Sequence, residues 1–239
     1  MAGLSQRFIN AGFTLPKYML YVQNKSLFNL SICGFSKYFK TCKFLFIARD
    51  IFDTKNFIEK ECTLLGIDNF ETIILENPTN GQAETVFIGA DKADINNNEP
   101  ITIFNIDTFR PDFIFPEMLN KWDGYLEVFN GEGSNWSYAK TENPESTKVV
   151  ETAEKVQISS YCSTGLYYFK RMELFNFAFQ SNLNTPHRRN IKELYVAPLY
   201  NILIKENFNI YINLIAKDEV QFCGTPDEYF VYLKQKIIA

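Results

Sequence analysis

Short apolar runs alternate with helix-like segments through the first half of the chain, and this alternation constrains the fold more than any other feature. Three runs read as buried strands: KFLFIA (43–48), ETIIL (71–75) and ITIFNID (101–107). Residues 53–65 and 81–94 read as the helices between them. Strand–helix–strand repeats form right-handed crossovers. We therefore expect an α/β fold with a mainly parallel, Rossmann-like sheet flanked by helices.

The second half of the sequence has a different pattern, with several strands that follow one another without long helices between them. These strands are GYLEVF (124–129), NWSYAKT (135–141), TKVVETAEK (147–155) and STGLYYF (163–169). Strands joined in this way pair antiparallel, so we expect an antiparallel extension of the sheet. Three further segments read as helices: residues 171–182, 193–206 and 226–238. We find no linker or repeat and expect one domain over 1–239.

Charge and cysteine content exclude several classes of protein. The 239 residues carry a net charge of −4, which gives no support to binding of nucleic acid or of anionic membranes. None of the five cysteines forms a C-x-x-C pair, so neither a disulfide framework nor a zinc site is expected. This composition fits a reducing cytoplasm. The sequence contains no apolar run of about 18 residues, so we expect no membrane-spanning helix.

The first residues read as a loop followed by a lysine. Ala2, Gly3, Leu4 and Ser5 lead into Arg7, and Leu15-Pro16-Lys17 follows. Backbone N–H groups of such a loop can surround phosphates, and a lysine behind it can place a positive charge on a triphosphate. The alternative is an ordinary turn with a solvated surface lysine.

Two segments follow buried strands of the first half. In the segment 77–85, Gly81 would let the backbone approach a planar ligand, and the Gln82 amide could contact a base edge. Asp107 follows the third strand, at a place where α/β sheets bind ligands, and its carboxylate could hold Mg²⁺. The alternatives are a hinge between strand and helix at Gly81 and a turn capped by Asp107.

Three polar groups of the second half are further candidates. Glu154 could accept hydrogen bonds from hydroxyl groups and Lys155 could bind a phosphate, although an adjacent Glu–Lys pair is also typical of a solvated strand edge. Thr164 and Gly165 lie in the strand that follows. His187 is the only histidine, so a His-rich metal site is excluded. We expect His187, Arg188 and Arg189 to form a solvated loop, with a phosphate contact as the alternative.

The order of these segments resembles that of the nucleotidyltransferases that join a nucleoside triphosphate to a sugar phosphate or a similar phosphate. Within that family, the chain is similar to enzymes of capsule and lipopolysaccharide biosynthesis. The segments that carry the resemblance are GLSQRF, LPK, NGQAETV, FNIDT, EKVQISSYCSTGLYYFKR, ELYVAPLYNILIKEN and CGTPDEY. Together they extend from residue 2 to residue 233.

The resemblance implies a role for each candidate residue. The backbone of Ala2, Gly3, Leu4 and Ser5 would surround the phosphates, Arg7 would contact the departing pyrophosphate and Lys17 the α-phosphate. Gly81 and Gln82 would contact the base, and Asp107 would bind Mg²⁺. The acceptor would meet Glu154, Lys155, Thr164 and Gly165. Residues 1–120 would then be the nucleotide-binding half and residues 121–239 the acceptor-binding half.

The sequence departs from the family pattern in three ways. Gln221-Phe222-Cys223 stands where many relatives have a second metal-binding aspartate, which leaves Asp218 as a weak substitute. The loop lacks the fuller Gly-Gly-x-Gly-Thr-Arg form, so the base preference stays open. A strand precedes this loop in the family, so we expect an apolar strand of about five residues before Met1.

The expected reaction transfers a nucleoside monophosphate from the triphosphate to the acceptor and releases pyrophosphate. Two alternatives stay open. A glycosyltransferase of the same architecture would normally carry Asp-x-Asp, whereas this chain has Asn105-Ile106-Asp107. A catalytically inactive nucleotide-binding module would fit the missing second aspartate. The partners implied are a nucleoside triphosphate and a phosphorylated small molecule, and a homodimer stays open.

Overall fold

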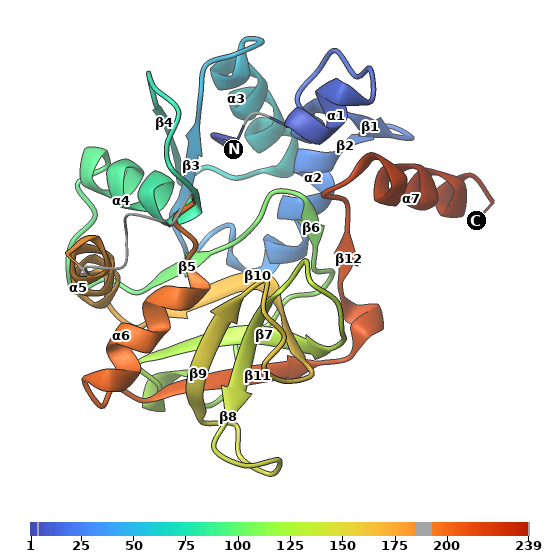
Figure 1. Ribbon diagram of the computed structural model, residues 1–239. Helices are drawn as coiled ribbons and strands as arrows, with labels where there is room; N and C mark the ends of the chain where they lie inside the picture. Colours follow the sequence, from blue (N-terminus) through green and yellow to red (C-terminus); the bar gives the residue numbers. More distant parts are fainter. Residues whose placement is uncertain (4, 185–192, 239) are drawn as a thin grey trace. The chain divides into compact units, whose positions relative to one another are not determined.

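The structure, a computed structural model, describes residues 1–3, 5–184 and 193–238, and it divides into two compact units (Figure 1). Unit 1 comprises Met1–Thr79, Asn105–Ile114 and the segment from Asp218 to the C-terminus. Unit 2 comprises Asn80–Phe104 and Phe115–Lys217. Each unit therefore draws on both halves of the sequence, and a boundary at residue 120 does not separate them.

Unit 1 contains short helical segments around three small pairs of strands. Its helical elements are α1 (Gln6–Asn10), η1 (Lys17–Met19), α2 (Leu27–Ile32), η2 (Cys33–Tyr38), α3 (Thr54–Leu65) and α7 (Pro226–Ile238). Its strands are β1 (Tyr21–Val22), β2 (Lys25–Ser26), β3 (Phe44–Ala48), β4 (Phe70–Ile74), β6 (Thr108–Phe109) and β12 (Gln221–Phe222). β3 and β4 are parallel, as the strand–helix–strand alternation predicted, while β1 pairs with β2 and β6 with β12 antiparallel.

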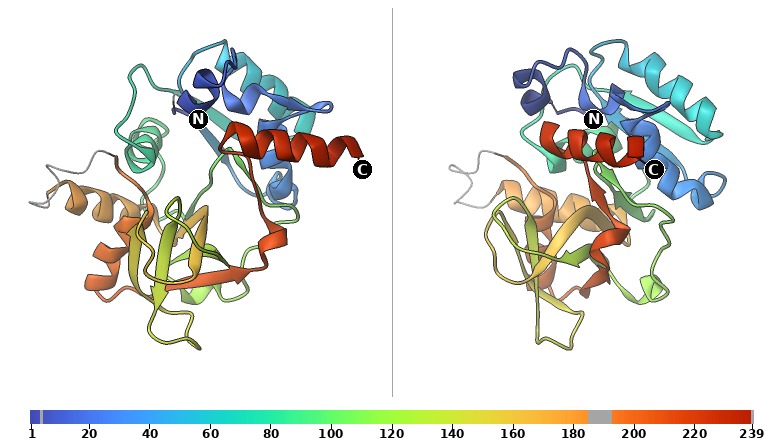
Figure 2. Two further views of the ribbon diagram at one scale, coloured as in Figure 1. Left: turned by 45° about the vertical axis from the view of Figure 1, so that its right-hand side comes forward. Right: turned by 90° about the vertical axis from the view of Figure 1, so that its right-hand side faces the viewer.

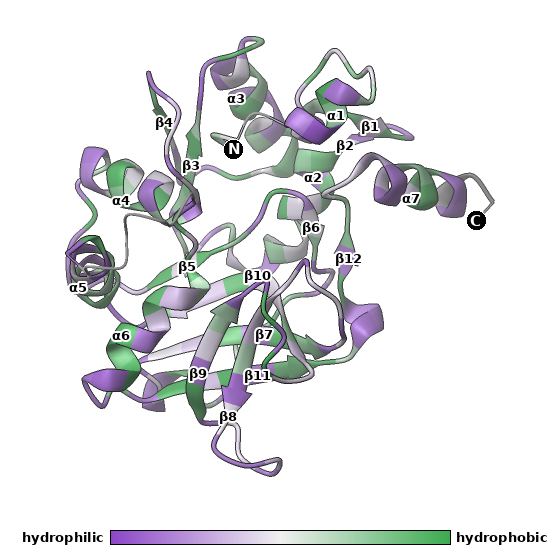
Figure 3. Ribbon diagram, in the orientation of Figure 1, coloured by the Kyte–Doolittle hydropathy of each residue, from purple (hydrophilic) through white to green (hydrophobic). Residues whose placement is uncertain are grey.

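The terminal helix α7 is part of the core of unit 1. Its Tyr229 and Tyr232 are buried with Phe8 of α1 and Phe109 of β6. The Tyr229 hydroxyl donates to the carbonyl oxygen of Tyr21 at 2.8 Å, and Figure 2 shows α7 beside the β1–β2 hairpin. Hydrophilic and hydrophobic residues alternate along α7, as Figure 3 shows, so one side of this helix can be buried while the other faces water.

Unit 2 is built on a six-stranded sheet. Its helical elements are α4 (Gln82–Lys92), η3 (Leu119–Lys121), α5 (Met172–Leu183), η5 (Ala197–Leu199) and α6 (Tyr200–Lys205). Its strands are β5 (Ile101–Ile103), β7 (Gly124–Asn130), β8 (Ser137–Thr141), β9 (Val149–Glu154), β10 (Tyr161–Phe169) and β11 (Ile210–Ile215). The strand order is β11-β7-β10-β8-β9, and β5 also pairs with β10.

The expectation of a mainly parallel sheet was wrong, although the fold is a mixed α/β fold as predicted. In the six-stranded sheet, β11 and β7 are parallel, whereas β10 runs antiparallel to β5, β7 and β8. The error concerns the run 101–107, which we expected as a third parallel strand: β5 pairs antiparallel with β10 instead. The antiparallel pairing expected among the strands of the second half is confirmed. A continuous apolar run indicates burial on both faces but carries no information about strand direction. The strand expected before Met1 lies outside this sequence and stays a prediction.

Tyr200 joins the helices of unit 2 to the sheet. It is fully buried and its ring stacks on Phe169 of β10 with ring centroids 4.6 Å apart. Its hydroxyl lies 2.8 Å from the carbonyl oxygen of Tyr168 and 3.0 Å from that of Tyr125, so the buried polar group has acceptors. Burial raises the pKa of Tyr200 well above its usual value, which keeps the hydroxyl protonated.

Two segments differ locally from their expected structure. The strand expected over 101–107 ends at Ile103, and Asp107 lies in a turn before β6. The Ser31 hydroxyl supports this turn by donating to the Thr108 carbonyl oxygen at 2.9 Å. The loop expected to lead into Arg7 is shorter than expected, because Gln6 and Arg7 already belong to α1. No helix within residues 1–3, 5–184 and 193–238 is long and apolar enough to cross a lipid bilayer.

Candidate functional site

In unit 1, the structure brings together two of the predicted site residues that are 90 residues apart in the sequence. Lys17 begins η1, and Asp107 lies in the turn before β6. The Lys17 ammonium group donates a hydrogen bond to Oδ2 of Asp107 and forms an ion pair with it. The two side chains are 24% and 20% exposed, so the pair is largely shielded but reachable from solvent.

The charge of Lys17 decides the protonation state of Asp107. Burial raises the pKa of the Asp107 carboxyl, but the positive charge and the hydrogen bond of Lys17 outweigh this effect. The pKa of Asp107 is therefore below its usual value, and the carboxylate is ionised at neutral pH. The Asp107 carboxylate is suited to binding a metal cation, and the Lys17 ammonium group is suited to binding a phosphate.

The first loop contacts this pair through Ser5. The Ser5 hydroxyl oxygen accepts a hydrogen bond from the backbone N–H of Lys17 at 3.3 Å. Ser5 has a φ of 50°, and its carbonyl oxygen accepts bonds from the first turn of α1. Ala2 is buried and Gly3 is exposed. Leu4, which we also expected at the phosphates, lies outside the described residues.

Arg7 does not join this group. It lies in α1, and its side chain is exposed. Across the described part of the chain, no hydrogen bond or ion pair connects Arg7 with Lys17 or Asp107. Contact of Arg7 with a pyrophosphate group stays a prediction.

The turn before α7 closes on the Asp107 side chain. The backbone N–H of Cys223 donates to the Asp107 carbonyl oxygen at 2.8 Å. A Cβ added at Gly224 would lie 2.9 Å from Oδ2 of Asp107, so only glycine fits without displacing the carboxylate. Glu228 holds this turn, because its Oε2 accepts from the N–H groups of Gly224 at 2.8 Å and Thr225 at 3.0 Å. We call Ser5, Lys17, Asp107 and Gly224 the Lys17 cluster.

The sequence contained a signal for Glu228 that our reading did not use. Thr225 and Glu228 form a capping box, in which the Glu228 N–H donates to the Thr225 hydroxyl oxygen at 3.3 Å. The sequence pattern T-x-x-E is the usual mark of this motif. Asp218, the weak substitute for a second metal-binding aspartate, is exposed in η6 (Lys217–Glu219), and no contact among the described residues joins it to Asp107.

In unit 2, Glu154 is hydrogen-bonded to one neutral hydroxyl group, which is itself hydrogen-bonded to a second. The Ser137 hydroxyl donates to Oε2 of Glu154, and the Tyr167 hydroxyl donates to Oγ of Ser137 at 3.3 Å. Burial raises the pKa of Glu154, and the Ser137 hydrogen bond and the Lys155 charge offset this only in part. The net pKa of Glu154 is above its usual value.

Lys155 has two partners, because its ammonium group contacts Tyr195 and also forms a long ion pair with Glu154. Its backbone has a φ of 59°, and its ammonium group contacts the Tyr195 hydroxyl. The same ammonium group lies 4.5 Å from the centroid of the Tyr195 ring, within the range of a cation–π interaction. Its distance to Oε1 of Glu154 is 4.0 Å. We call Ser137, Glu154, Lys155, Tyr167 and Tyr195 the Glu154 cluster.

Thr164 and Gly165 lie inside the sheet at an irregularity of β10. The register with β7 shifts between Ser163 and Tyr167. The Thr164 side chain is buried and its hydroxyl donates to Oε1 of the buried Glu127 at 3.2 Å. The Gly165 N–H donates to the Ser163 hydroxyl oxygen at 3.1 Å. The structure therefore accounts for Thr164 by its contact with Glu127, a residue that the sequence reading missed.

Gly81 lies against the backbone of Leu194. A Cβ added at Gly81 would lie 2.5 Å from the Leu194 carbonyl oxygen, so this close approach requires glycine. The same oxygen accepts a hydrogen bond from the N–H of Ala83 at 2.9 Å. Gln82 begins α4 and is partly buried. Packing explains Gly81, and contact of Gly81 and Gln82 with a base stays a prediction.

Comparison with known proteins places this geometry in a family. No family model and no curated protein matches the chain. Among solved structures, a nucleoside-diphosphate-sugar pyrophosphorylase from Vibrio cholerae RC9 is 49% identical, covers 98% of each chain and superposes with a TM-score of 0.94. The chain belongs to the nucleotidyltransferase family.

Two more distant structures share the fold. An inositol-1-phosphate CTP transferase from T. maritima is 13% identical, with a TM-score of 0.73 and coverage of 99% of this chain and 93% of the other. A UDP-glucose pyrophosphorylase solved with UDP-glucose is 16% identical, with a TM-score of 0.72 and coverage of 99% and 96%. The relative from Vibrio cholerae, at 49% identity, makes our chain an enzyme of the nucleotidyltransferase class, as the order of its motifs predicted.

Within the described part of this nucleotidyltransferase, no group of three or more His, Cys, Asp or Glu side chains is arranged to hold a metal ion. His187, Arg188 and Arg189 lie outside the described residues, so their expected loop stays a prediction. The nucleotidyltransferase therefore offers two separate groups of predicted site residues: the Lys17 cluster in unit 1 and the Glu154 cluster in unit 2.

Proposed function

We propose that the enzyme transfers a nucleoside monophosphate from a nucleoside triphosphate to a sugar phosphate or a similar phosphate and releases pyrophosphate. The observation that carries the proposal is the 49% identity, over 98% of both chains, to a nucleoside-diphosphate-sugar pyrophosphorylase. Conversion of a sugar phosphate to a nucleoside-diphosphate sugar is this reaction, run in the direction of synthesis.

The Lys17 cluster is suited to the triphosphate. We assign Lys17 to the α-phosphate, Arg7 to the departing pyrophosphate, and the backbone of Ala2, Gly3, Leu4 and Ser5 to the remaining phosphate oxygens. The hydrogen bond from the Lys17 N–H to Ser5 Oγ supports this assignment, because it fixes the lysine to the loop. In this assignment Gly81 and Gln82 contact the base.

The residues of the Lys17 cluster fit a magnesium ion that is bound together with substrate. Mg²⁺ keeps several water molecules and usually takes one or two carboxylates plus substrate phosphates. Asp107 supplies one ionised carboxylate, whereas the carboxylate of Glu228 is occupied by the N–H groups of Gly224 and Thr225. We therefore assign Asp107 as the protein ligand. When bound, the ion would neutralise charge on the phosphate oxygens and orient them.

The Glu154 cluster is suited to the acceptor. The Glu154 carboxylate can accept hydrogen bonds from sugar or polyol hydroxyl groups, as it now does from Ser137. Lys155 can bind the acceptor phosphate once its ammonium group leaves the Tyr195 hydroxyl. We retain Thr164 and Gly165 as part of the acceptor pocket through their backbone, since the Thr164 hydroxyl contacts Glu127.

The chemical step follows from these assignments. An oxygen of the acceptor phosphate forms a bond to the α-phosphorus, and the bond from that phosphorus to the bridging oxygen of pyrophosphate breaks. The electron pair leaves with pyrophosphate. The attacking oxygen already carries negative charge, so no side chain has to remove a proton. Lys17, Arg7 and Lys155 contribute by holding the reactants in line and by neutralising their charge.

We further propose that the product serves capsule or surface-polysaccharide synthesis and that the reaction takes place in the cytoplasm. The support for the pathway is the resemblance of the motif order to enzymes of that group. The support for the compartment is the cysteine composition and the need for nucleoside triphosphates.

A substrate screen tests the proposed function. The four nucleoside triphosphates are combined with a panel of sugar, polyol and amino-acid-derived phosphates, with Mg²⁺, and pyrophosphate is measured. We expect pyrophosphate only when one triphosphate and one acceptor are both present. Transfer of sugar from a nucleoside-diphosphate sugar, without pyrophosphate, would favour a glycosyltransferase. Nucleotide binding with no turnover on any pair would favour an inactive module.

A further inference from the structure

The terminal helix α7 carries an exposed stripe on the side that faces away from the core of unit 1. The exposed residues are Asp227, Phe230, Val231 and Lys234. They are spaced at i, i+3, i+4 and i+7, so they lie within about 100° of the helix surface. The opposite side of the helix carries the two buried tyrosines described above. We call these four exposed residues the α7 stripe.

The middle of the α7 stripe is apolar. Phe230 is 46% exposed and Val231 is 56% exposed. The partly buried Phe13 packs on Phe230 with ring centroids 5.9 Å apart, so the apolar surface continues from α7 onto the loop that follows α1. Burial of this surface against a partner is favourable because it removes apolar area from water.

The two ends of the α7 stripe carry opposite charges. Asp227 lies in the first turn of the helix, and Lys234 lies about two turns later. Side chains three or four positions apart are neighbours on a helix, whereas these two are seven positions apart. Neither side chain makes an ion pair or a hydrogen bond with another described residue. Both charges are therefore available to a partner.

The order acidic, apolar, apolar, basic is complementary to itself when it is read in the opposite direction. A second α7 can lie antiparallel to the first, with a two-fold axis between positions 230 and 231. Each Asp227 then faces Lys234 of the other copy, and each Phe230 faces Val231 of the other copy. A parallel pair would instead bring like charges together at both ends. The α7 stripe therefore has the self-complementary pattern that a two-fold interface requires.

We propose that the α7 stripe is the contact surface of a homodimer, in which two copies of the chain pair through antiparallel α7 helices. A second copy suits this surface better than an anionic membrane does, because the stripe contains a carboxylate and the chain has a net charge of −4. A pair of helices of this length buries less area than a standard protein interface. The dimer is therefore reversible, with a Kd of roughly 10–100 µM.

Sedimentation velocity on the full chain tests the dimer without any turnover, so its outcome is independent of the proposed function. We expect a shift from monomer to dimer between about 1 and 300 µM. Asp227→Lys and Lys234→Asp each place like charges opposite one another at both ends of the antiparallel pair. Each variant alone should dimerise at least about tenfold more weakly than the wild type. An equimolar mixture of the two variants should regain dimerisation, because opposite charges then meet at both ends.

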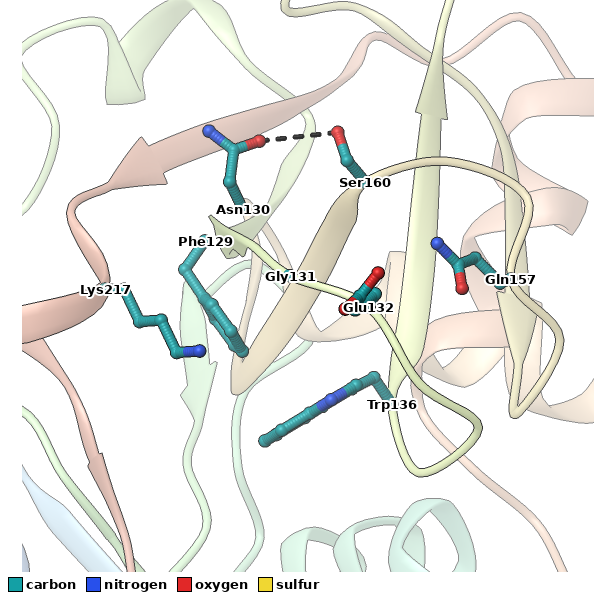
Figure 4. A pocket seen from close by; sticks show the side chains of 8 residues that line it. All are labelled: Phe129, Asn130, Gly131, Glu132, Trp136, Gln157, Ser160 and Lys217. Carbon is teal, nitrogen blue, oxygen red and sulfur yellow. Dashed lines mark hydrogen bonds between the residues drawn. The ribbon is translucent and has the colours of Figure 1, made fainter.

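A second set of variants tests the apolar middle of the stripe. Val231→Arg should abolish the dimer up to about 300 µM, because the two-fold axis places the change in the interface twice. Leu64→Arg is the matched control, since Leu64 is 67% exposed on α3 of the same unit. Lys217→Asp is the control for charge reversal, because Lys217 is exposed and lines a hollow in unit 2 (Figure 4). Both controls should dimerise as the wild type does.

Three results would overturn the proposal. The first is a wild-type chain that stays monomeric up to about 300 µM. The second is a dimer that persists in Val231→Arg or in Lys234→Asp alone, which would assign self-association to another surface. The third is a monomer whose binding to phosphatidylcholine vesicles is lost in Val231→Arg, which would assign the stripe to a lipid surface. The Val231 and Lys234 variants keep the test valid even if Asp227→Lys, at the start of the helix, folds poorly.

Discussion

Unit 1 and unit 2 each contain a carboxylate beside a lysine, but the two pairs behave differently. In unit 1 the Lys17 ammonium group contacts the Asp107 carboxylate, and the pKa of Asp107 is lowered although burial alone would raise it. In unit 2 the Lys155 ammonium group lies 4.0 Å from Glu154 and contacts Tyr195, and burial raises the pKa of Glu154. The hydroxyl of Ser137 takes the place that a cation has in unit 1.

The difference shows that neighbours in sequence need not be the strongest partners in charge. Glu154 and Lys155 are adjacent, yet their charged groups are 4.0 Å apart, and the Lys155 ammonium group also contacts the Tyr195 hydroxyl. Lys17 and Asp107 are 90 residues apart and are in contact. A carboxyl group is held ionised by the cation that touches it in space, however far apart the two residues are in the sequence. The reason is that the Coulomb energy falls with the distance between the charges and with solvent access.

Removal of the charge on Asp107 should have the largest effect. Asp107→Asn keeps the size of the side chain but removes the anion that Lys17 contacts and that we assign to Mg²⁺. We expect turnover to fall by at least about a hundredfold. Steady-state pyrophosphate release would measure it, with circular dichroism as the control for folding. Near-normal Mg²⁺-dependent turnover would remove Asp107 from the site.

The two lysines should separate the two substrates. Lys17→Ala should raise the apparent KM for the triphosphate by about tenfold, and Lys155→Ala should do the same for the acceptor, because each would lose one charged contact with a phosphate. Initial rates with one substrate saturating and the other varied would measure this. Each variant serves as the matched control of the other. Identical behaviour toward both substrates would contradict the assignment of one cluster to each substrate.

Gly224→Ala tests whether the position of Asp107 matters as well as its charge. The added Cβ would lie 2.9 Å from Oδ2 of Asp107, so the carboxylate would have to move. We expect turnover to fall by about tenfold, since a small misplacement at a reacting centre is costly. The double variant with Asp107→Asn gives the control: no further loss is expected, because both changes act on one carboxylate. Fully additive losses would mean that Gly224 acts elsewhere.

The pKa shifts of Asp107 and Glu154 have opposite directions, so the stabilities of their variants should depend on pH in opposite ways. This is the smallest effect that we expect. The pKa of Glu154 is raised above its ordinary 4.5, so its contribution is present below that value and is lost as pH rises through the folded pKa. Glu154→Gln should therefore gain stability relative to the wild type as pH rises. The pKa of Asp107 is lowered below its ordinary 3.8, so its contribution is present above that value and is lost as pH falls.

Relative to the wild type, Asp107→Asn should therefore lose stability as pH rises over the same range. Urea unfolding at several pH values between about 3 and 7 would give both differences. Slopes of the same sign for the two variants would contradict the contrast between the two units.

The sequence predicted many of the elements because their residue patterns are local. The apolar run 43–48 is β3 (Phe44–Ala48), the segment 53–65 is α3 (Thr54–Leu65), and the helix expected over 226–238 is α7, capped by Thr225. Strand direction could not be predicted in the same way. The run 101–107 was assigned to a parallel sheet by its place in the strand–helix alternation, but β5 pairs antiparallel with β10, a partner from a distant part of the sequence.

The order of the motifs named candidate site residues, but it could not predict which of them are in contact. Lys17 and Asp107 were expected to serve one substrate, and the structure places them in contact. The contact of Gly224 with Asp107 depends on the fold of two distant segments, which no local pattern contains. Glu127 was missed because a carboxylate in an apolar strand gives no sign that it will accept a hydrogen bond from a threonine.

The contact between Lys17 and Asp107 couples the ligands that we assign to them. In the free enzyme the two charges neutralise each other. A divalent cation on the carboxylate would release the ammonium group for a phosphate, and a phosphate on the ammonium group would release the carboxylate for a cation. By thermodynamic reciprocity each ligand then raises the affinity for the other by the same factor. The enzyme should therefore bind a metal–nucleotide complex as one unit while holding neither component tightly by itself.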